Sequence, residues 1–158
     1  MLDHGCEHNS IFIDTSTFLK ILLEQSEDPP ATDRSFNKLK RSCILYTSHL
    51  VIGEIYNAIH QEYINSLKEN LKNAEYQFQN LCKYSRELLL GISLLEIDPE
   101  VIQSLKFLPV CREFENRDNL ILGTAIAHKC KSLFTSDKVF YDRIKEKLEN
   151  KTINIKLF

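Results

Sequence analysis

Short apolar stretches alternate with helical patterns along most of the chain, and this alternation constrains the fold more than any other feature. Five stretches predict strands, at residues 10–13, 43–46, 93–97, 132–135 and 153–158. Apolar residues at helical spacing predict helices over 15–25, 34–41, 48–91 with a break near 66–70, 99–106, 117–130 and 138–149. Strands that alternate with helices favour a parallel sheet covered on both faces. We therefore expect a three-layer α/β/α fold.

Length and composition favour one ordinary domain and exclude several other classes. The 158 residues can bury their own core, and no boundary divides them, so we expect a single domain over 1–158. The net charge of -2 argues against a strongly basic binder of duplex nucleic acid. The cysteines are odd in number and lack zinc-site spacing, which indicates reduced thiols. Without an apolar span or a signal-peptide pattern, we expect a cytoplasmic protein with no membrane contact.

Two of the predicted strands end at an aspartate. The apolar run 11–13 leads directly to Asp14, and the strand 132–135 leads through Ser136 to Asp137. In open parallel sheets the functional site lies outside the carboxyl ends of the strands. If these strands are neighbours, the two carboxylates face each other at that edge. The alternative is that each aspartate only caps the helix that follows it.

Two further acids lie on the apolar faces of predicted helices. Glu54 falls within an apolar arc formed by Leu50, Val51, Ile55, Ala58 and Ile59. Asp118 shares a helix face with Leu122 and Ala125, and Gly123 predicts that this helix approaches the sheet closely. A carboxylate that faces a core is costly unless it has a partner. The alternatives are an arginine partner for Glu54 and a helix-cap or helix-dipole role for Asp118.

Asp14, Glu54, Asp118 and Asp137, called the four acids below, together predict a metal site. Two carboxylates about 5 Å apart repel by about 3 kcal/mol at an effective dielectric constant near 20. A converging set therefore needs either protonation or a cation. Oxygen ligands without histidine or cysteine suit Mg²⁺ or Mn²⁺. Such an ion lowers the pKa of an attacking water and stabilises the charge of a phosphodiester under hydrolysis.

These motifs together resemble the PIN domain nucleases. The segments FIDTSTFLKILL, TSHLVIGEIYNAI and NRDNLILGTAIAHKCKSLFTSDKVF follow one another in that order, and a terminal strand comes last. The resemblance is closest to the small VapC-type toxin ribonucleases of prokaryotic toxin–antitoxin pairs. It implies a five-stranded sheet of order 3-2-1-4-5, with the four acids as catalytic and metal-binding residues. It also implies supporting roles for Thr135 and Ser16, and RNA as the substrate.

The chain is longer than the small toxins, and two segments account for the excess. They are residues 27–42 and a long helical stretch, which we interpret as an insertion over about 60–91. Apolar residues recur at helical spacing in the second segment, so we expect it to serve self-association as a dimer, or a partner protein such as an antitoxin.

A basic stretch and two other motifs provide secondary candidates. Lys38, Lys40 and Arg41 either contact RNA phosphates near the site or form a solvated helix face. The terminal motif HGCEH (residues 4–8) offers His4, Cys6 and His8 as metal ligands, although no second ligand pair lies near it in the sequence. Glu115 is a candidate fifth acid, whereas His49, Asn57 and His60 are assigned to a solvated face.

The favoured function is a Mg²⁺- or Mn²⁺-dependent endoribonuclease in which a metal-activated water attacks RNA phosphodiesters. The biological role would be that of a toxin or an RNA-processing enzyme. One rival is a phosphoaspartyl phosphatase-like enzyme with Asp14 as nucleophile, but that chemistry usually wants a second Asp where this chain has Ser16. The other rival is a PIN-like module that binds RNA or protein without catalysis, which the presence of all four acids disfavours.

Overall fold

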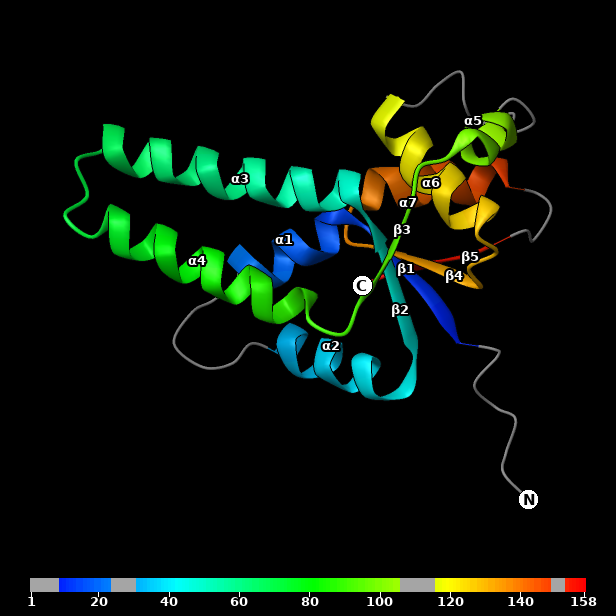
Figure 1. The fold of residues 1–158 in the computed structure, drawn as a ribbon, viewed down its shortest axis with the longest axis horizontal. Coiled ribbons are helices and arrows are strands. Elements are labelled where there is room, and N and C mark those ends of the chain that lie inside the picture. Colours follow the sequence, from blue (N-terminus) through cyan, green and yellow to red (C-terminus); the bar gives the residue numbers. More distant parts are fainter. Residues whose placement is uncertain (1–8, 24–30, 106–115, 149–152) are drawn as a thin grey trace.

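The computed structural model describes residues 9–23, 31–105, 116–148 and 153–158. Figure 1 shows how its helices and strands are arranged. In chain order the elements are β1 (Ser10–Ile13), α1 (Thr15–Leu23), α2 (Ala31–Ser42), β2 (Ile44–Ser48), α3 (His49–Lys68), α4 (Ala74–Leu89), β3 (Ser93–Leu95), α5 (Pro99–Leu105), α6 (Asn116–Ala127), β4 (Ser132–Thr135), α7 (Lys138–Lys147) and β5 (Asn154–Leu157).

The strands form one parallel sheet in the order β3-β2-β1-β4-β5. In the central register, Phe12 of β1 lies beside Tyr46 of β2 and Leu133 of β4. β1 is buried on both faces because helices cover the sheet on each side, which explains why its sequence is a continuous apolar run. The edge strands β3 and β5 are more exposed. This order confirms the expected fold class.

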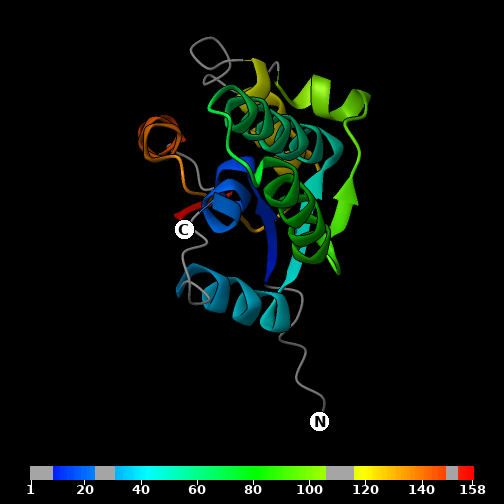
Figure 2. The same cartoon turned by 90° about the vertical axis from the view of Figure 1, so that its left-hand side faces the viewer.

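Helices cover both faces of the sheet. The chain moves toward one edge from β1 to β3 and toward the other edge from β3 to β5. Right-handed crossovers therefore place α1 to α4 on one face and α5 to α7 on the opposite face. Within the first layer α1 packs against α2, α3 and α4, whereas α5 packs on α6 and α7 packs on β4 and β5 (Figure 2). The predicted three layers are thus confirmed.

α3 and α4 form a long hairpin that extends well beyond the sheet (Figure 1). The chain turns between them at residues 69–73, close to the predicted break. Most of the apolar positions of α4 are used inside the protein, where they are buried or pack against the core: Ala74, Phe78, Leu81 and Leu88. Leu67 and Leu71, near the turn, are exposed. Self-association and the status of 60–91 as an insertion therefore stay predictions.

Several element bounds and one packing contact differ from the sequence-based expectation, and two of these differences have a clear structural reason. β2 extends to Ser48 because Thr47 and Ser48 still pair with β3, so the strand is longer than the predicted 43–46. Gly123 was expected to bring its helix close to the sheet, but a Cβ at this position would lie 2.6 Å from Cδ2 of Leu105. The glycine therefore makes room for α5 rather than for the sheet.

The structure bears on two further expectations. None of the described helices is long and apolar enough to cross a membrane. Cys43, Cys82 and Cys130 are free thiols. Cys6 and Cys111 lie outside the described residues.

Candidate active site

The four acids line one pocket of about 360 Å³, which we call the acid pocket. Asp14 follows the last residue of β1, and its backbone N–H still donates to the carbonyl of Phe134 in β4 at 3.0 Å. Glu54 lies in α3, which follows β2 directly. Asp118 lies in the first turn of α6, and Asp137 is the N-cap of α7. The pocket therefore sits at the carboxyl edge of the sheet.

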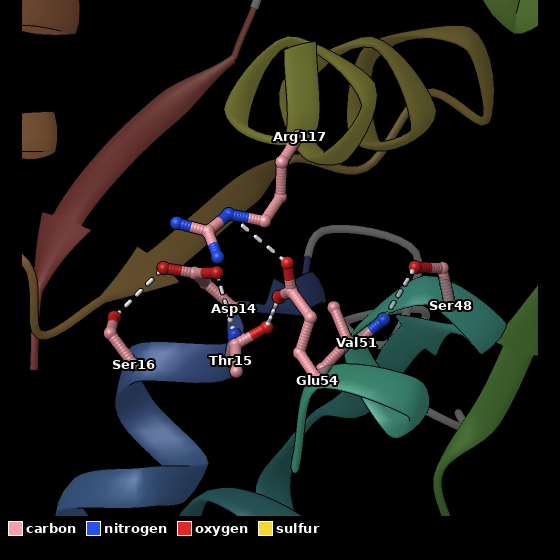
Figure 3. A network of polar contacts seen from close by, with 7 residues as sticks. All are labelled: Asp14, Thr15, Ser16, Ser48, Val51, Glu54 and Arg117. Atoms are coloured by element: carbon pink, nitrogen blue, oxygen red, sulfur yellow. Dashed lines mark hydrogen bonds and ion pairs between the residues drawn. The ribbon is translucent and has the colours of Figure 1, made fainter. Parts of the chain in front are cut away.

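Asp14 is buried and held by a set of short hydrogen bonds (Figure 3). Its Oδ1 accepts the backbone N–H of Thr15 at 2.6 Å. Its Oδ2 accepts the hydroxyls of Ser16 and Thr135, both at 2.8 Å. The residue is only 6 % exposed, so these donors replace most of the water that an exposed carboxylate would bind. The carboxylate consequently has a fixed orientation toward the pocket.

The same hydroxyls tie the end of β4 to the start of α1. The Ser16 Oγ accepts the backbone N–H of Ser136 at 2.9 Å and that of Asp137 at 3.2 Å. The Thr135 Oγ1 also accepts the Asp137 N–H, at 3.1 Å. The Asp137 carboxylate in turn caps α7, because its Oδ1 accepts the N–H of Phe140 at 3.0 Å. Asp137 therefore has both the capping role and a place in the acid pocket.

Burial raises the pKa of the Asp14 carboxyl above its ordinary value. The hydrogen bonds from Ser16, Thr135 and Thr15 oppose this rise in pKa, and the negative charge of Asp137 adds to it. A cation bound in the pocket would compensate the buried charge of Asp14 and so oppose this rise in its pKa.

Glu54 has a partner at each of its carboxylate oxygens. The hydroxyl of Thr15 donates to Oε2. Nε of Arg117 lies 3.2 Å from Oε1, and this ion pair joins α6 to α3. The Glu54 side chain is 16 % exposed, whereas that of Arg117 is 58 % exposed. The arginine partner that was the alternative interpretation of Glu54 is therefore present. The same carboxylate also lines the acid pocket.

The acid pocket suits a hard cation by its chemistry but does not surround one closely. Carboxylate oxygens are the preferred ligands of Mg²⁺ and Mn²⁺. Within the described part of the chain, however, no three acidic, histidine or cysteine side chains are close enough to share one ion. Mg²⁺ commonly keeps several waters and uses one or two carboxylates, and this donor set fits that mode of binding. Asp14 is the best placed ligand because it is buried and fixed.

The basic residues predicted to contact RNA lie elsewhere. Lys38, Lys40 and Arg41 are in the last turns of α2, just before Ile44, which pairs with the first residue of β1. They are therefore at the amino edge of the sheet, opposite the acid pocket. The Lys40 Nζ donates to the carbonyl of Glu87 at 3.3 Å, and burial lowers the pKa of this lysine. The structure does not bring this basic stretch to the acids.

Other sequence candidates are resolved only in part. His4, Cys6, His8 and Glu115 lie outside the described residues. His49 and His60 are exposed.

Four polar residues that line the acid pocket were not predicted as site residues: Thr15, Asn57, Gln61 and Arg117. Thr15 and Arg117 each adjoin one of the four acids in the sequence, which was the available signal. Asn57 is exposed, in agreement with its assignment to a solvated face, and it also borders the acid pocket.

Comparison with known proteins decides the family. The model of the PIN domain matches residues 11–146, which is most of the chain. The chain belongs to the PIN domain family. The resemblance drawn from its motifs is thereby confirmed, and the order of the sheet is the one which that resemblance implied. No curated protein matches this PIN domain significantly in sequence.

Three of the solved structures similar to this PIN domain are VapBC proteins, and one of them is described as a member of a family of toxin–antitoxin systems. VapBC2 from Rickettsia felis, bound to a DNA fragment from its promoter, has a TM-score of 0.63 and 16 % identity, covering 94 % of this chain and 98 % of that one. DNA-bound VapBC from Salmonella typhimurium has a TM-score of 0.62 and 15 % identity, with the same coverage of 94 % and 98 %. VapBC-5 from Mycobacterium tuberculosis has a TM-score of 0.52 and 12 % identity, covering 94 % and 97 %. At these identities the likeness concerns the fold.

Proposed function

We propose that this PIN domain is a Mg²⁺- or Mn²⁺-dependent endoribonuclease that hydrolyses RNA phosphodiesters with an activated water. The observation that carries the proposal is the convergence of the four acids on one pocket at the carboxyl edge of the sheet. Membership of the PIN family supports nuclease chemistry in general. The choice of metal and of RNA is the specific part of the proposal.

The protein's own groups would bind and orient the reactants. Asp14 would be the main metal ligand, because three short hydrogen bonds hold its oxygens in place before any ion arrives. Glu54, Asp118 and Asp137 would hold the ion directly or through water. A bound Mg²⁺ or Mn²⁺ would supply activation of water and neutralisation of phosphate charge. Asn57 and Gln61 offer uncharged amide groups for RNA at the rim of the acid pocket.

Two observations weigh against a phosphatase-like reaction with Asp14 as covalent nucleophile. Both oxygens of Asp14 already accept hydrogen bonds, and the side chain is almost fully buried. Ser16 supports Asp14 where that chemistry would need a second acid. A module that only binds RNA or protein would have no need for the buried acid and its donors. Metal-assisted hydrolysis is therefore the function that the geometry supports best.

The first experiment is an RNA cleavage assay of Asp14→Asn with Mg²⁺ or Mn²⁺. An amide is a poor metal ligand, so cleavage should fall by more than the roughly 10–100-fold typical of residues that only support a ligand. EDTA should abolish cleavage by the wild type, and either metal should restore it. The matched control is Asp142→Asn, because Asp142 is exposed on α7 and does not line the acid pocket. Full cleavage in EDTA would reject the metal-dependent mechanism.

The proposed setting is a toxin–antitoxin pair in the cytoplasm. The fold similarity to VapBC proteins supports an antitoxin as the protein partner. The free thiols of Cys43, Cys82 and Cys130 agree with a reducing compartment. Inspection of the neighbouring gene for a small DNA-binding protein, followed by co-purification, tests the pairing. Sedimentation of the isolated chain tests whether it forms the proposed dimer.

A further inference from the structure

We infer that Arg117 is a built-in counter-cation of the acid pocket, which holds Glu54 while no metal is bound and competes with a divalent ion for that carboxylate. The inference rests on the proposed function, because it concerns metal binding at the same site. It gives Arg117 a positioning role that acts through Glu54.

The placement of Arg117 is the first argument. α3 and α6 lie on opposite faces of the sheet, and their amino-terminal turns meet beyond its carboxyl edge. The Arg117 side chain reaches from α6 toward Glu54 on α3, across the end of β1 that carries Asp14 (Figure 3). Among the described residues that line the acid pocket, Arg117 is the one cation. Its charge thus stands among the four carboxylates.

The state of the Glu54 carboxylate is the second argument. Thr15 on α1 already donates to Oε2, so Oε1 is the oxygen that faces the cation. Nε of Arg117 is 3.2 Å from Oε1, yet this buried oxygen accepts no aligned hydrogen bond from the described residues. An ion pair without an aligned hydrogen bond, made by a half-exposed arginine, is weak and exchangeable. A divalent ion that needs an oxygen ligand can therefore replace it.

Competition of this kind predicts that removing Arg117 strengthens metal binding. Because the Arg117 side chain is 58 % exposed, solvent screens this pair. Screened ion pairs are typically worth a few tenths to one kcal/mol, which corresponds to a change of about two- to fivefold in an equilibrium constant. Arg117→Gln should therefore bind Mn²⁺ about two- to fivefold more tightly than the wild type. An arginine that only stabilised the fold would give unchanged or weaker metal binding when it is removed.

The test is calorimetric titration of the metal-free protein with Mn²⁺ alone, for the wild type, Arg117→Gln and Arg86→Gln. Arg86 is exposed on α4 and outside the acid pocket, so its replacement removes the same charge without touching Glu54. The inference expects tighter Mn²⁺ binding for Arg117→Gln and wild-type affinity for Arg86→Gln. Thermal melting should agree, with a lower melting temperature for Arg117→Gln in EDTA and a larger rise on addition of Mn²⁺.

Each other result is decisive. Equal or weaker Mn²⁺ affinity in Arg117→Gln, with normal binding by the wild type, overturns the inference and leaves the proposed function intact. Tightening in both arginine variants also overturns it, since the effect would then come from net charge alone. Absence of Mn²⁺ binding in every protein rejects the metal-dependent function and this inference together. If Arg117→Gln does not fold, Arg117→Met removes the charge but keeps an aliphatic side chain of similar reach, and it too should bind Mn²⁺ more tightly than the wild type.

Discussion

Replacing Thr135 by valine tests how the acid pocket holds Asp14. The Thr135 side chain is fully buried, donates to Oδ2 of Asp14 at 2.8 Å and accepts the Asp137 N–H at 3.1 Å. Valine has nearly the same shape, so the change removes two hydrogen bonds with little effect on packing. A hydrogen bond to a charged group contributes about 1.5–3 kcal/mol, and a neutral one about 1 kcal/mol. The free energy of unfolding should therefore fall by about 3 kcal/mol where Asp14 is ionised.

The pH dependence of this loss is the decisive part. The hydrogen bond from Thr135 lowers the pKa of Asp14 against the effect of burial, so its removal raises the folded-state pKa further. When the pKa of Asp14 is higher in the folded state than in the unfolded state, the free energy of unfolding falls as the pH rises from the unfolded-state pKa to the folded-state pKa. Thr135→Val should therefore be less destabilising at a pH where Asp14 is protonated. There it should lower the free energy of unfolding by about 2 kcal/mol, compared with about 3 kcal/mol where Asp14 is ionised.

The measurement is urea unfolding in EDTA between pH 4 and pH 8, with Thr47→Val as the matched control. Thr47 is equally buried, but its hydroxyl donates to the neutral carbonyl of Ile13 at 3.1 Å. Its replacement should cost about 1 kcal/mol at every pH. A loss for Thr135→Val that stays constant with pH, parallel to that of Thr47→Val, would refute the argument that Thr135 stabilises an ionised Asp14.

Three further predictions concern stability alone. In EDTA, the free energy of unfolding should decrease less with rising pH in Asp14→Asn than in the wild type, because the variant lacks the buried carboxyl whose pKa is raised. An unchanged dependence on pH would contradict this. Asp137→Asn should melt at or above the wild type in EDTA, since it removes a repulsive charge and keeps an acceptor for the Phe140 N–H. Mg²⁺ at a hundredfold excess over Kd should stabilise the wild type by about 2.7 kcal/mol and this variant much less, and equal shifts would remove Asp137 from the site. Lys129→Gly should gain about 1 kcal/mol in urea unfolding, because Lys129 has a φ of 55° just after α6, whereas Asn70→Gly, at a φ of 53°, should gain less.

The parallel sheet was predictable from sequence pattern, and the pairing that brings Asp14 to the end of β4 was predictable from the resemblance to the PIN domain nucleases. Buried strands leave continuous apolar runs, and the carboxyl end of a parallel strand is a fixed place in the fold. The apolar periodicity of α3 likewise predicted that Glu54 faces inward, and its neighbours Val51 and Ile55 are indeed buried. These features follow from the apolar pattern within each segment, which does not depend on contacts with other segments.

The contacts between segments were not predictable in this way. The partner of Glu54 is Arg117, which is far away in the sequence and belongs to another helix. Nothing in the spacing of either helix specifies that their amino-terminal turns meet. Gly123 gave a correct signal of close packing, but the neighbour proved to be Leu105 of α5. One of the two interpretations of the basic turn that contains Lys40 placed it near the acids, whereas the topology places it at the opposite edge.

The hydroxyl of Ser16 also has a consequence for the order in which the protein gains its site. It joins Asp14 to the backbone of Ser136 and Asp137, residues about 120 positions later in the chain. Contacts of such large sequence separation carry a high entropic cost, because the long intervening loop must be closed. Until β4 has joined β1, Asp14 has only the local donors of Thr15 and Ser16 and lacks the hydroxyl of Thr135. The acid pocket is therefore complete only when the residues after β4 are in place, and a local opening of the β1–β4 pair would remove the Thr135 hydrogen bond and separate Asp137 from Asp14.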